Sequence, residues 1–390
     1  MLPTRRLYES EPYGAEFAAN VLACRPDVRD PAYWQCALDA TAFYPEGGGQ
    51  PCDLGLLGGE PVLAVEQDGD GVIWHRTARP LAQGQTVSGA IDWDRRFDHM
   101  QQHTGEHILS GTLHRMFGAE NVGFHIGSPW VRMDMNLPLT PQQLAEAERA
   151  ANRTVQTDGA IRCWYPEPAQ LAELDYRSKK ELTGPVRLVD AAGADLCACC
   201  GTHVATAGQV GMIKILSSQH YKGGVRLAVA CGMRAVTELQ ALTADAQAAG
   251  ARMSVPAGQL AGAAGRLLEA QAALKQRAHA LQTSLCEALA AAAQPGQGQV
   301  LFLEGVDGDG LRRIAMTLAG ATGARCAVLA PGGQGLSYAL AAGPDGDVRE
   351  LCRRLNAEFS GRGGGKAGFC QGSLPGEVDR QAVERFLQNG

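Results

Sequence analysis

Two pairs of residues with metal-binding side chains, far apart in the sequence, constrain this chain more than any other feature. His103 and His107 are spaced i, i+4, and Cys199 and His203 repeat that spacing. A helix is predicted to begin at Asp98, so the two imidazoles of the first pair lie on one face, one turn apart. A fold that brings the second pair to this helix face creates a four-residue site.

The donor atoms of these pairs indicate which metal such a site would hold. A soft thiolate combined with imidazoles selects zinc over magnesium or calcium. The thiolate and the neutral imidazoles bind only when deprotonated, which neutral pH allows once a metal lowers the cysteine pKa. The sequence therefore predicts a Zn²⁺ site. Cys197 and Cys200 flank Cys199 and are possible competitors, and His99, one turn before His103, is predicted to be a polar neighbour.

The order of local patterns predicts an α+β protein with four segments. At 390 residues the chain exceeds one ordinary core, and its 45% hydrophobic content is that of globular proteins. Residues 1–95 hold short alternating runs punctuated by Gly and Pro, which predict a small β-barrel. Residues 96–235 carry both ligand pairs on mixed helices and strands, with strands predicted from Gln209 and Val225.

The last two segments differ sharply in composition. Residues 236–293 are helical and rich in Ala, Gln and Leu, and every seventh position holds a leucine (Leu260, Leu267, Leu274 and Leu281). That repeat predicts either a coiled-coil dimer seam or a helix packed on its own domain. Residues 294–390 return to α/β alternation, with a glycine cluster, GRGGGKAG, predicted as a loop.

Charge and cysteine usage exclude some classes of protein. A net charge of −6 disfavours a protein that coats nucleic acid indiscriminately, although a local basic surface remains compatible with it. The twelve cysteines are scattered, as in a reducing cytosol, and no apolar run of membrane-spanning length or signal-peptide core occurs. We expect a cytoplasmic protein without membrane contact.

Longer motifs around the ligand pairs resemble a known family. HTGEH, followed by CCGTHVATAGQVGMIKI, is similar to the editing domain of alanyl-tRNA synthetase and to its free-standing relatives, the AlaX proteins. FYPEGGGQPCDLG, VGFHIG and YKGGVRLAVACG resemble family segments in family order, and the glycine cluster resembles the closing domain of the synthetase. The resemblance covers nearly the whole chain and is that of the long AlaX type. It implies a trans-editing hydrolase without aminoacylation activity, which deacylates serine, or glycine, from alanine tRNA.

The resemblance also implies roles for single residues. The family's metal ligands fall on His103, His107, Cys199 and His203, although Cys200 stands where the family usually has Gly. A catalytic zinc keeps one position open, so His203 is the ligand expected to leave. Family position makes four further residues candidates for contacts with the substrate or the tRNA end: Glu46, Gln50, Phe124 and His125. Glu106 is a candidate base, or orients water.

The C-terminal glycine cluster predicts a contact with phosphate or with a second chain. Its spacing is not that of a P-loop, and Ala367 replaces the hydroxyl that would hold magnesium. Basic side chains surround it: Arg353, Arg354, Arg362 and Lys366. We therefore expect tRNA as a partner and a possible homodimer through the helical segment and this domain.

Two alternative functions remain open at this stage. His103-Thr-Gly-Glu106-His107 also satisfies H-x-x-E-H, a zinc-peptidase pattern in which the Glu activates water. Such enzymes take a carboxylate as the third ligand, whereas here a thiolate is available. The other alternative is a non-catalytic, zinc-containing tRNA-binding factor.

Overall fold

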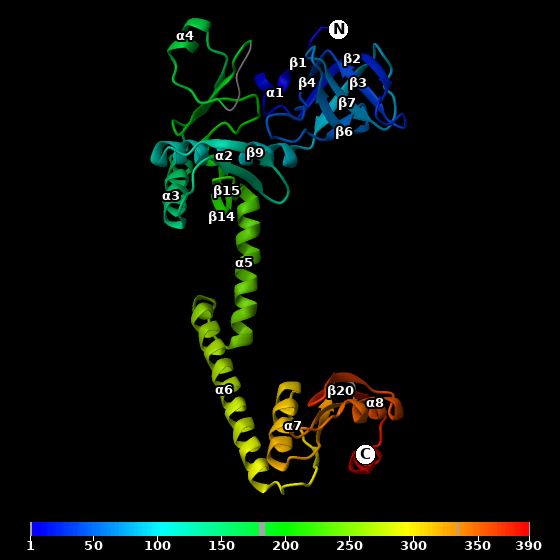
Figure 1. Cartoon of the computed structure of the whole chain (residues 1–390). Coiled ribbons are helices and arrows are strands. Elements are labelled where there is room, and N and C mark those ends of the chain that lie inside the picture. Colours follow the sequence, from blue (N-terminus) through cyan, green and yellow to red (C-terminus); the bar gives the residue numbers. More distant parts are fainter. Residues whose placement is uncertain (1, 179–183, 334, 390) are drawn as a thin grey trace. The chain divides into compact units, whose positions relative to one another are not determined.

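A computed structural model describes residues 2–178, 184–333 and 335–389 (Figure 1). The chain divides into two compact units: unit 1, Met1–Ala246, and unit 2, Gln247–Gly390. The finer division into four segments stays a prediction.

The first part of unit 1 is a closed β-barrel, which confirms the predicted barrel. Its six strands follow the order β2-β3-β7-β6-β5-β8. Apolar side chains that alternate along the strands, among them Val21, Leu38 and Val65, fill its interior. The strands are β2 (Glu16–Pro26), β3 (Trp34–Leu38), β5 (Gly55–Leu57), β6 (Glu60–Gln67), β7 (Ile73–Thr77) and β8 (Thr86–Ile91). Beside it lie α1 (Leu7–Ser10) and the parallel pair β1 (Arg5–Arg6) and β4 (Ala40–Thr41).

The ligand-bearing helix α2 (Trp93–Phe117) begins earlier than predicted. Asp92, at the end of β8, is its N-cap and accepts a hydrogen bond from the Arg95 backbone N–H at 3.1 Å. Asp98 instead lies inside the helix, where it pairs with Arg234. The prediction of a start at Asp98 was wrong because Asp92 caps the chain directly as it leaves the barrel strand.

Helix α2 packs on a four-stranded sheet of order β14-β15-β10-β9 (Figure 1). Its strands are β9 (Asn121–Ile126), β10 (Val131–Met135), β14 (Ile213–Tyr221) and β15 (Gly224–Cys231). The short 3₁₀-helix η1 (Ala207–Val210) comes just before β14. The first predicted strand thus begins a few residues after Gln209, and the second close to Val225. Helix α3 (Pro141–Thr157) covers α2 and β14, and the buried face of the sheet joins both helices in one apolar core.

A smaller sheet of order β11-β12-β13 carries the second ligand pair into place. It consists of β11 (Ile161–Trp164), β12 (Leu188–Ala191) and β13 (Leu196–Ala198), with α4 (Pro168–Glu173) between the first two strands. Because β13 ends at Ala198, Cys199 is the first residue to leave the sheet.

The predicted helical segment forms two helices, α5 (Gly232–Met253) and α6 (Leu260–Ala292), joined through η2 (Ala257–Gln259) after Pro256. The leucines at the seventh positions are largely exposed: Leu267 by 63%, Leu274 by 68% and Leu281 by 63%. The C-terminal end of α6, around Cys286, packs into the core of unit 2. A solvent-exposed leucine row remains compatible with the predicted dimer seam.

Unit 2 also contains a five-stranded sheet of order β16-β17-β18-β20-β19. The strands are β16 (Val300–Phe302), β17 (Cys326–Gly332), β18 (Gly335–Ala341), β19 (Arg362–Lys366) and β20 (Phe369–Pro375), with α7 (Gly308–Thr322), α8 (Arg349–Glu358) and α9 (Arg380–Asn389). The glycine cluster is therefore not a loop. Its residues pair antiparallel with β20, the strand directly after it, and form an exposed edge strand, because this hairpin satisfies the backbone groups of a segment whose own side chains favour no strand.

Both units mix helices with mostly antiparallel sheets, so the chain is α+β, as predicted. Among the helices of the described residues, none has the length and apolar character needed to cross a membrane.

Candidate metal centre

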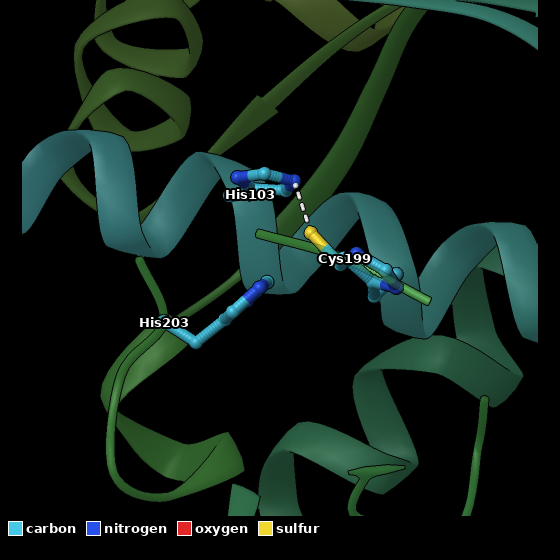
Figure 2. Close-up of side chains that lie close together, drawn as sticks. His103, Cys199 and His203 are labelled. Carbon is cyan, nitrogen blue, oxygen red and sulfur yellow. Dashed lines mark hydrogen bonds between the residues drawn. The ribbon is translucent and has the colours of Figure 1, made fainter. Parts of the chain in front are cut away.

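The structure gathers the two predicted ligand pairs at one point. Helix α2 places the rings of His103 and His107 with centroids 5.4 Å apart, and the segment after β13 brings Cys199 and His203 against them. One donor atom from each of the four residues lies within 4.8 Å of all the others. Figure 2 shows His103 and His203 directed toward the Cys199 sulfur, which lies 3.4 Å from His103 Nε2.

Each imidazole is held through its Nδ1 atom. His103 Nδ1 contacts Gln50 Oε1 at 2.8 Å, and His107 Nδ1 contacts Asp195 Oδ2 at 2.9 Å. The third contact, from His203 Nδ1 to Thr104 Oγ1, is the longest at 3.2 Å. A histidine that donates its Nδ1 proton keeps the Nε2 lone pair for a metal.

The donor set fits zinc. The Nε2 atom of His203 is buried and has no hydrogen-bond partner within the described residues, an arrangement that a metal would satisfy. Three nitrogens and one sulfur within a few ångströms match the tetrahedral preference of zinc. Gly201 makes room for this packing, since a Cβ atom at that position would clash with the His103 ring.

Electrostatics favour the ligating forms of Cys199 and His203, and the protonated form of His107. Burial would raise the pKa of the Cys199 thiol, but the surrounding imidazoles outweigh burial and hold it well below its ordinary value. Burial lowers the pKa of His203 to about 3, so this imidazole is neutral. Burial would also lower the pKa of His107, but its bonds to Asp195 and the neighbouring thiols raise it well above the usual range. Metal binding at His107 therefore has to release a proton.

A cavity of about 480 Å³ opens onto the cluster. His103 and His107 line it together with Phe124, Arg187 and the backbone of Gly48 and Gly49. Its size is that of a small-ligand site.

Glycine at position 49 allows the barrel loop to reach this cavity. Gly49 has φ +82°, and a Cβ atom there would lie 2.5 Å from the Phe124 carbonyl oxygen. Its own carbonyl accepts a hydrogen bond from the Ile126 N–H at 2.7 Å, which ties the loop to β9.

The four residues predicted to contact substrate or tRNA separate into two groups. Gln50 is buried against His103 and donates to Thr202 Oγ1 at 2.8 Å, and the Phe124 ring lies 5.0 Å from the His103 ring. Glu46 and His125 are exposed and do not line the cavity. His125 faces away because neighbouring residues of a strand point to opposite faces of the sheet.

The other candidates near the helix lie beside the cluster. Glu106 is buried, its Oε1 accepts a hydrogen bond from Asn121 Nδ2, and its carboxylate is not among the four gathered ligands. His99 is buried and likewise outside that group. Cys200 is exposed, whereas the buried Cys197 forms a second, overlapping group with His107 and Asp195. Cys197 is thus the nearer of the two possible competitors.

The basic residues predicted around the glycine cluster lie in unit 2. Arg353 pairs with Glu350 at 2.6 Å, and the Arg354 guanidinium lies 5.5 Å from the centre of the Phe386 ring. Arg362 and Lys366 are the exposed end residues of β19.

Sequence reasoning missed the groups that hold the ligands: Thr104, Arg177, Asp195 and Thr202. The available signal was the position of Asp195, four residues before Cys199, since carboxylates often orient ligand histidines. No sequence pattern marks Arg177, because it reaches Asp195 through the pairing of its backbone with β13 in the folded chain.

Known proteins resemble both the region around Cys199 and His203 and most of the chain. The family model described as the threonyl and alanyl tRNA synthetase second additional domain matches residues 186–227, which include Cys199 and His203. The alanyl-tRNA editing protein Aarsd1 of Danio rerio is 29% identical over 368 residues, covering 90% of this chain and 87% of that protein.

Synthetases are similar over part of their length. Alanine–tRNA ligase of Pyrococcus abyssi is 33% identical over 407 residues, covering 99% of this chain and 43% of the ligase. The ligase of Pyrococcus furiosus is 38% identical over 251 residues, covering 61% of this chain and 27% of the ligase. The chain therefore spans less than half the length of these ligases. The C-Ala domain from Aquifex aeolicus alanyl-tRNA synthetase matches 25% of the chain at 18% identity with a TM-score of 0.23, too low to support a structural argument.

Proposed function

We propose that this chain, a homologue of the alanyl-tRNA editing protein Aarsd1, is a zinc-dependent hydrolase that removes wrongly attached amino acids from tRNA. The observation that carries the proposal is the cluster of His103, His107, Cys199 and His203 at a cavity of about 480 Å³. The proposed substrate is tRNA for alanine that carries serine, or glycine, and the bond cleaved is the ester to the terminal ribose.

The four clustered residues would hold the zinc ion. When bound, zinc supplies a Lewis acid that polarises an ester carbonyl or acidifies water. A catalytic ion needs an open position, so one protein ligand has to give way. His203 is the best candidate, because its Nδ1 contact to Thr104 is the longest of the three.

The cavity offers a way to select serine. Phe124 lines it as an apolar wall, and the polar side chains of His103 and Arg187 line it as well. A site that hydrogen-bonds a substrate hydroxyl rejects an analogue lacking it far more strongly than an apolar pocket rejects an added hydroxyl. The serine hydroxyl is thus the group that such a site would recognise, and alanine lacks it.

The tRNA body requires a second surface. The exposed side chains of Arg362 and Lys366 at β19, with Arg353 and Arg354 on α8, would contact phosphates. The exposed leucines of α6 would form a seam with a second copy of the chain.

Deacylation of defined substrates tests the proposed reaction. The zinc-loaded protein is incubated with seryl-tRNA and alanyl-tRNA charged on alanine tRNA, and release of the amino acid is followed. We expect fast release of serine, slow release of alanine, and no release by Cys199→Ala.

A result with tRNA binding but no hydrolysis would instead identify a binding factor. Zinc-dependent cleavage of peptides that requires Glu106 would identify a peptidase. The buried position of Glu106 against Asn121 argues against that second outcome.

A further inference from the structure

Of the three clustered imidazoles, His107 is the one whose Nδ1 atom contacts a carboxylate. His107 contacts Asp195 Oδ2 through Nδ1 at 2.9 Å, and both side chains are only 2% exposed. His103 and His203 instead face neutral groups, the Gln50 amide oxygen and the Thr104 hydroxyl.

A single arginine orients the carboxylate that contacts His107. Arg177 donates through Nε to Asp195 Oδ1 at 2.8 Å and through Nη2 to Asp195 Oδ2 at 2.9 Å. The same Nη2 donates to Ser110 Oγ on α2 at 2.8 Å, and Nη1 reaches Glu120 Oε2 at 3.3 Å. The Arg177 backbone is also paired with β13 at Leu196 and Ala198. This fork ties the Asp195 strand to the helix that carries His107.

We propose that Arg177 and Asp195 act as a positioning pair that keeps the Nδ1 proton of His107 and leaves its Nε2 lone pair for the metal. The inference rests on the metal centre of the proposed function. Both Asp195 oxygens already accept from Arg177 or His107, so this carboxylate is an orienting group and not a ligand.

The shared oxygen of Asp195 predicts how two substitutions at this position should differ. Oδ2 accepts from both Arg177 Nη2 and His107 Nδ1, whereas Oδ1 accepts from Arg177 Nε. In Asp195→Asn an amide oxygen at the Oδ2 position would still accept from both donors, with the amide N–H₂ set against Arg177 Nε. Asp195→Ala leaves no acceptor for the Nδ1 proton of His107. The amide should therefore preserve part of the function that alanine removes.

Zinc affinity of the full chain, measured by competition with a chromophoric chelator, tests the pair without reference to catalysis. Asp195→Ala should weaken zinc binding roughly 10–100-fold. Asp195→Asn should keep at least several-fold more affinity than Asp195→Ala, and Arg177→Met should weaken binding by less than Asp195→Ala does. Glu120→Gln, which changes the other carboxylate partner of Arg177, should bind zinc as the unmodified protein does. Unchanged affinity in Asp195→Ala or in Arg177→Met, or equal losses in Asp195→Asn and Asp195→Ala, would overturn the proposal.

Two further measurements keep the test decisive. If Cys197→Ala loses as much affinity as Asp195→Ala, Asp195 belongs to the overlapping ligand group and is not an orienting residue. Nitrogen NMR of the unmodified, zinc-loaded protein reports the tautomer directly and needs no folded variant. We expect the His107 proton on Nδ1, and a proton on Nε2 would refute the pair. Zinc binding without deacylation would refute only the proposed function, and deacylation with unaltered affinity in Asp195→Ala would refute only the pair.

Discussion

A buried ion pair between α2 and the barrel loop should be among the most sensitive points for stability. The side chains of Arg96 and Asp53 are both 0% exposed. Arg96 Nε lies 3.1 and 3.0 Å from the two Asp53 oxygens, and the guanidinium also donates to the Pro12 and Ala42 carbonyls. Asp53 accepts from the Tyr44 N–H at 2.6 Å as well. The pair thus holds the loop that carries Gln50 against the helix that carries the histidines.

Arg96→Met should lower the free energy of unfolding by about 3–5 kcal/mol, because it leaves a buried carboxylate without its counter-charge. Arg96→Met with Asp53→Leu removes both charges. The losses that remain are the unpaired N–H of Tyr44, about 1–3 kcal/mol, and the donor to the Pro12 and Ala42 carbonyls, which is lost equally in both variants. The double variant should therefore be more stable than Arg96→Met by about 2 kcal/mol. If the two substitutions acted independently, the double variant would instead be the less stable one.

Denaturant unfolding followed by tryptophan fluorescence measures this difference in unit 1, since all five tryptophans lie within it. Arg29→Met is the matched control. It removes an arginine whose side chain is 63% exposed and paired with Glu66, a contact that should contribute less than about 1 kcal/mol. A loss below about 1 kcal/mol for Arg96→Met, or a double variant no more stable than it, would refute the reasoning.

Three other predictions follow from the site and the two units. Cys199→Ala should abolish zinc binding while Cys200→Ala retains it, as metal analysis of the purified variants will show; the reverse pattern would move the ligand to Cys200. Burial lowers the pKa of His75 to about 4. Below about pH 6.5 the unfolded chain therefore binds a proton at His75 that the folded chain does not bind. The free energy of unfolding should fall by roughly 3 kcal/mol between pH 6.5 and 4, and His75→Gln should flatten this slope; an unchanged slope contradicts the assignment. A fragment of residues 1–246 should keep zinc and hydrolysis but bind tRNA more weakly and with a shallower salt dependence, measured by titration at several salt concentrations; equal affinity and slope would remove unit 2 from tRNA binding.

The glycine cluster shows where reasoning from local sequence ends. A run of glycines has no intrinsic strand preference, so a loop is the natural prediction for it. It forms a hairpin with β20, and β20 is fixed in turn by its pairing with β18, which lies earlier in the chain. The start of α2 at Asp92 is similar, because the end of a barrel strand determined where the helix could begin.

The candidate metal ligands could be predicted from the sequence alone. The spacing of His103 and His107 requires one helix face, and a thiolate beside imidazoles selects zinc whatever the surrounding fold. Both are properties of covalent spacing and donor chemistry, which do not depend on distant parts of the chain.

Only the tertiary structure decided how each ligand is held. Asp195 contacts His107 from the residue before β13, Arg177 contacts Asp195, and Gln50 contacts His103 from the barrel loop. These contacts join residues far apart along the chain, and no local pattern specifies them. The tautomer of a ligand histidine depends on the hydrogen bond made by its other nitrogen, so it follows from the packing of the whole unit.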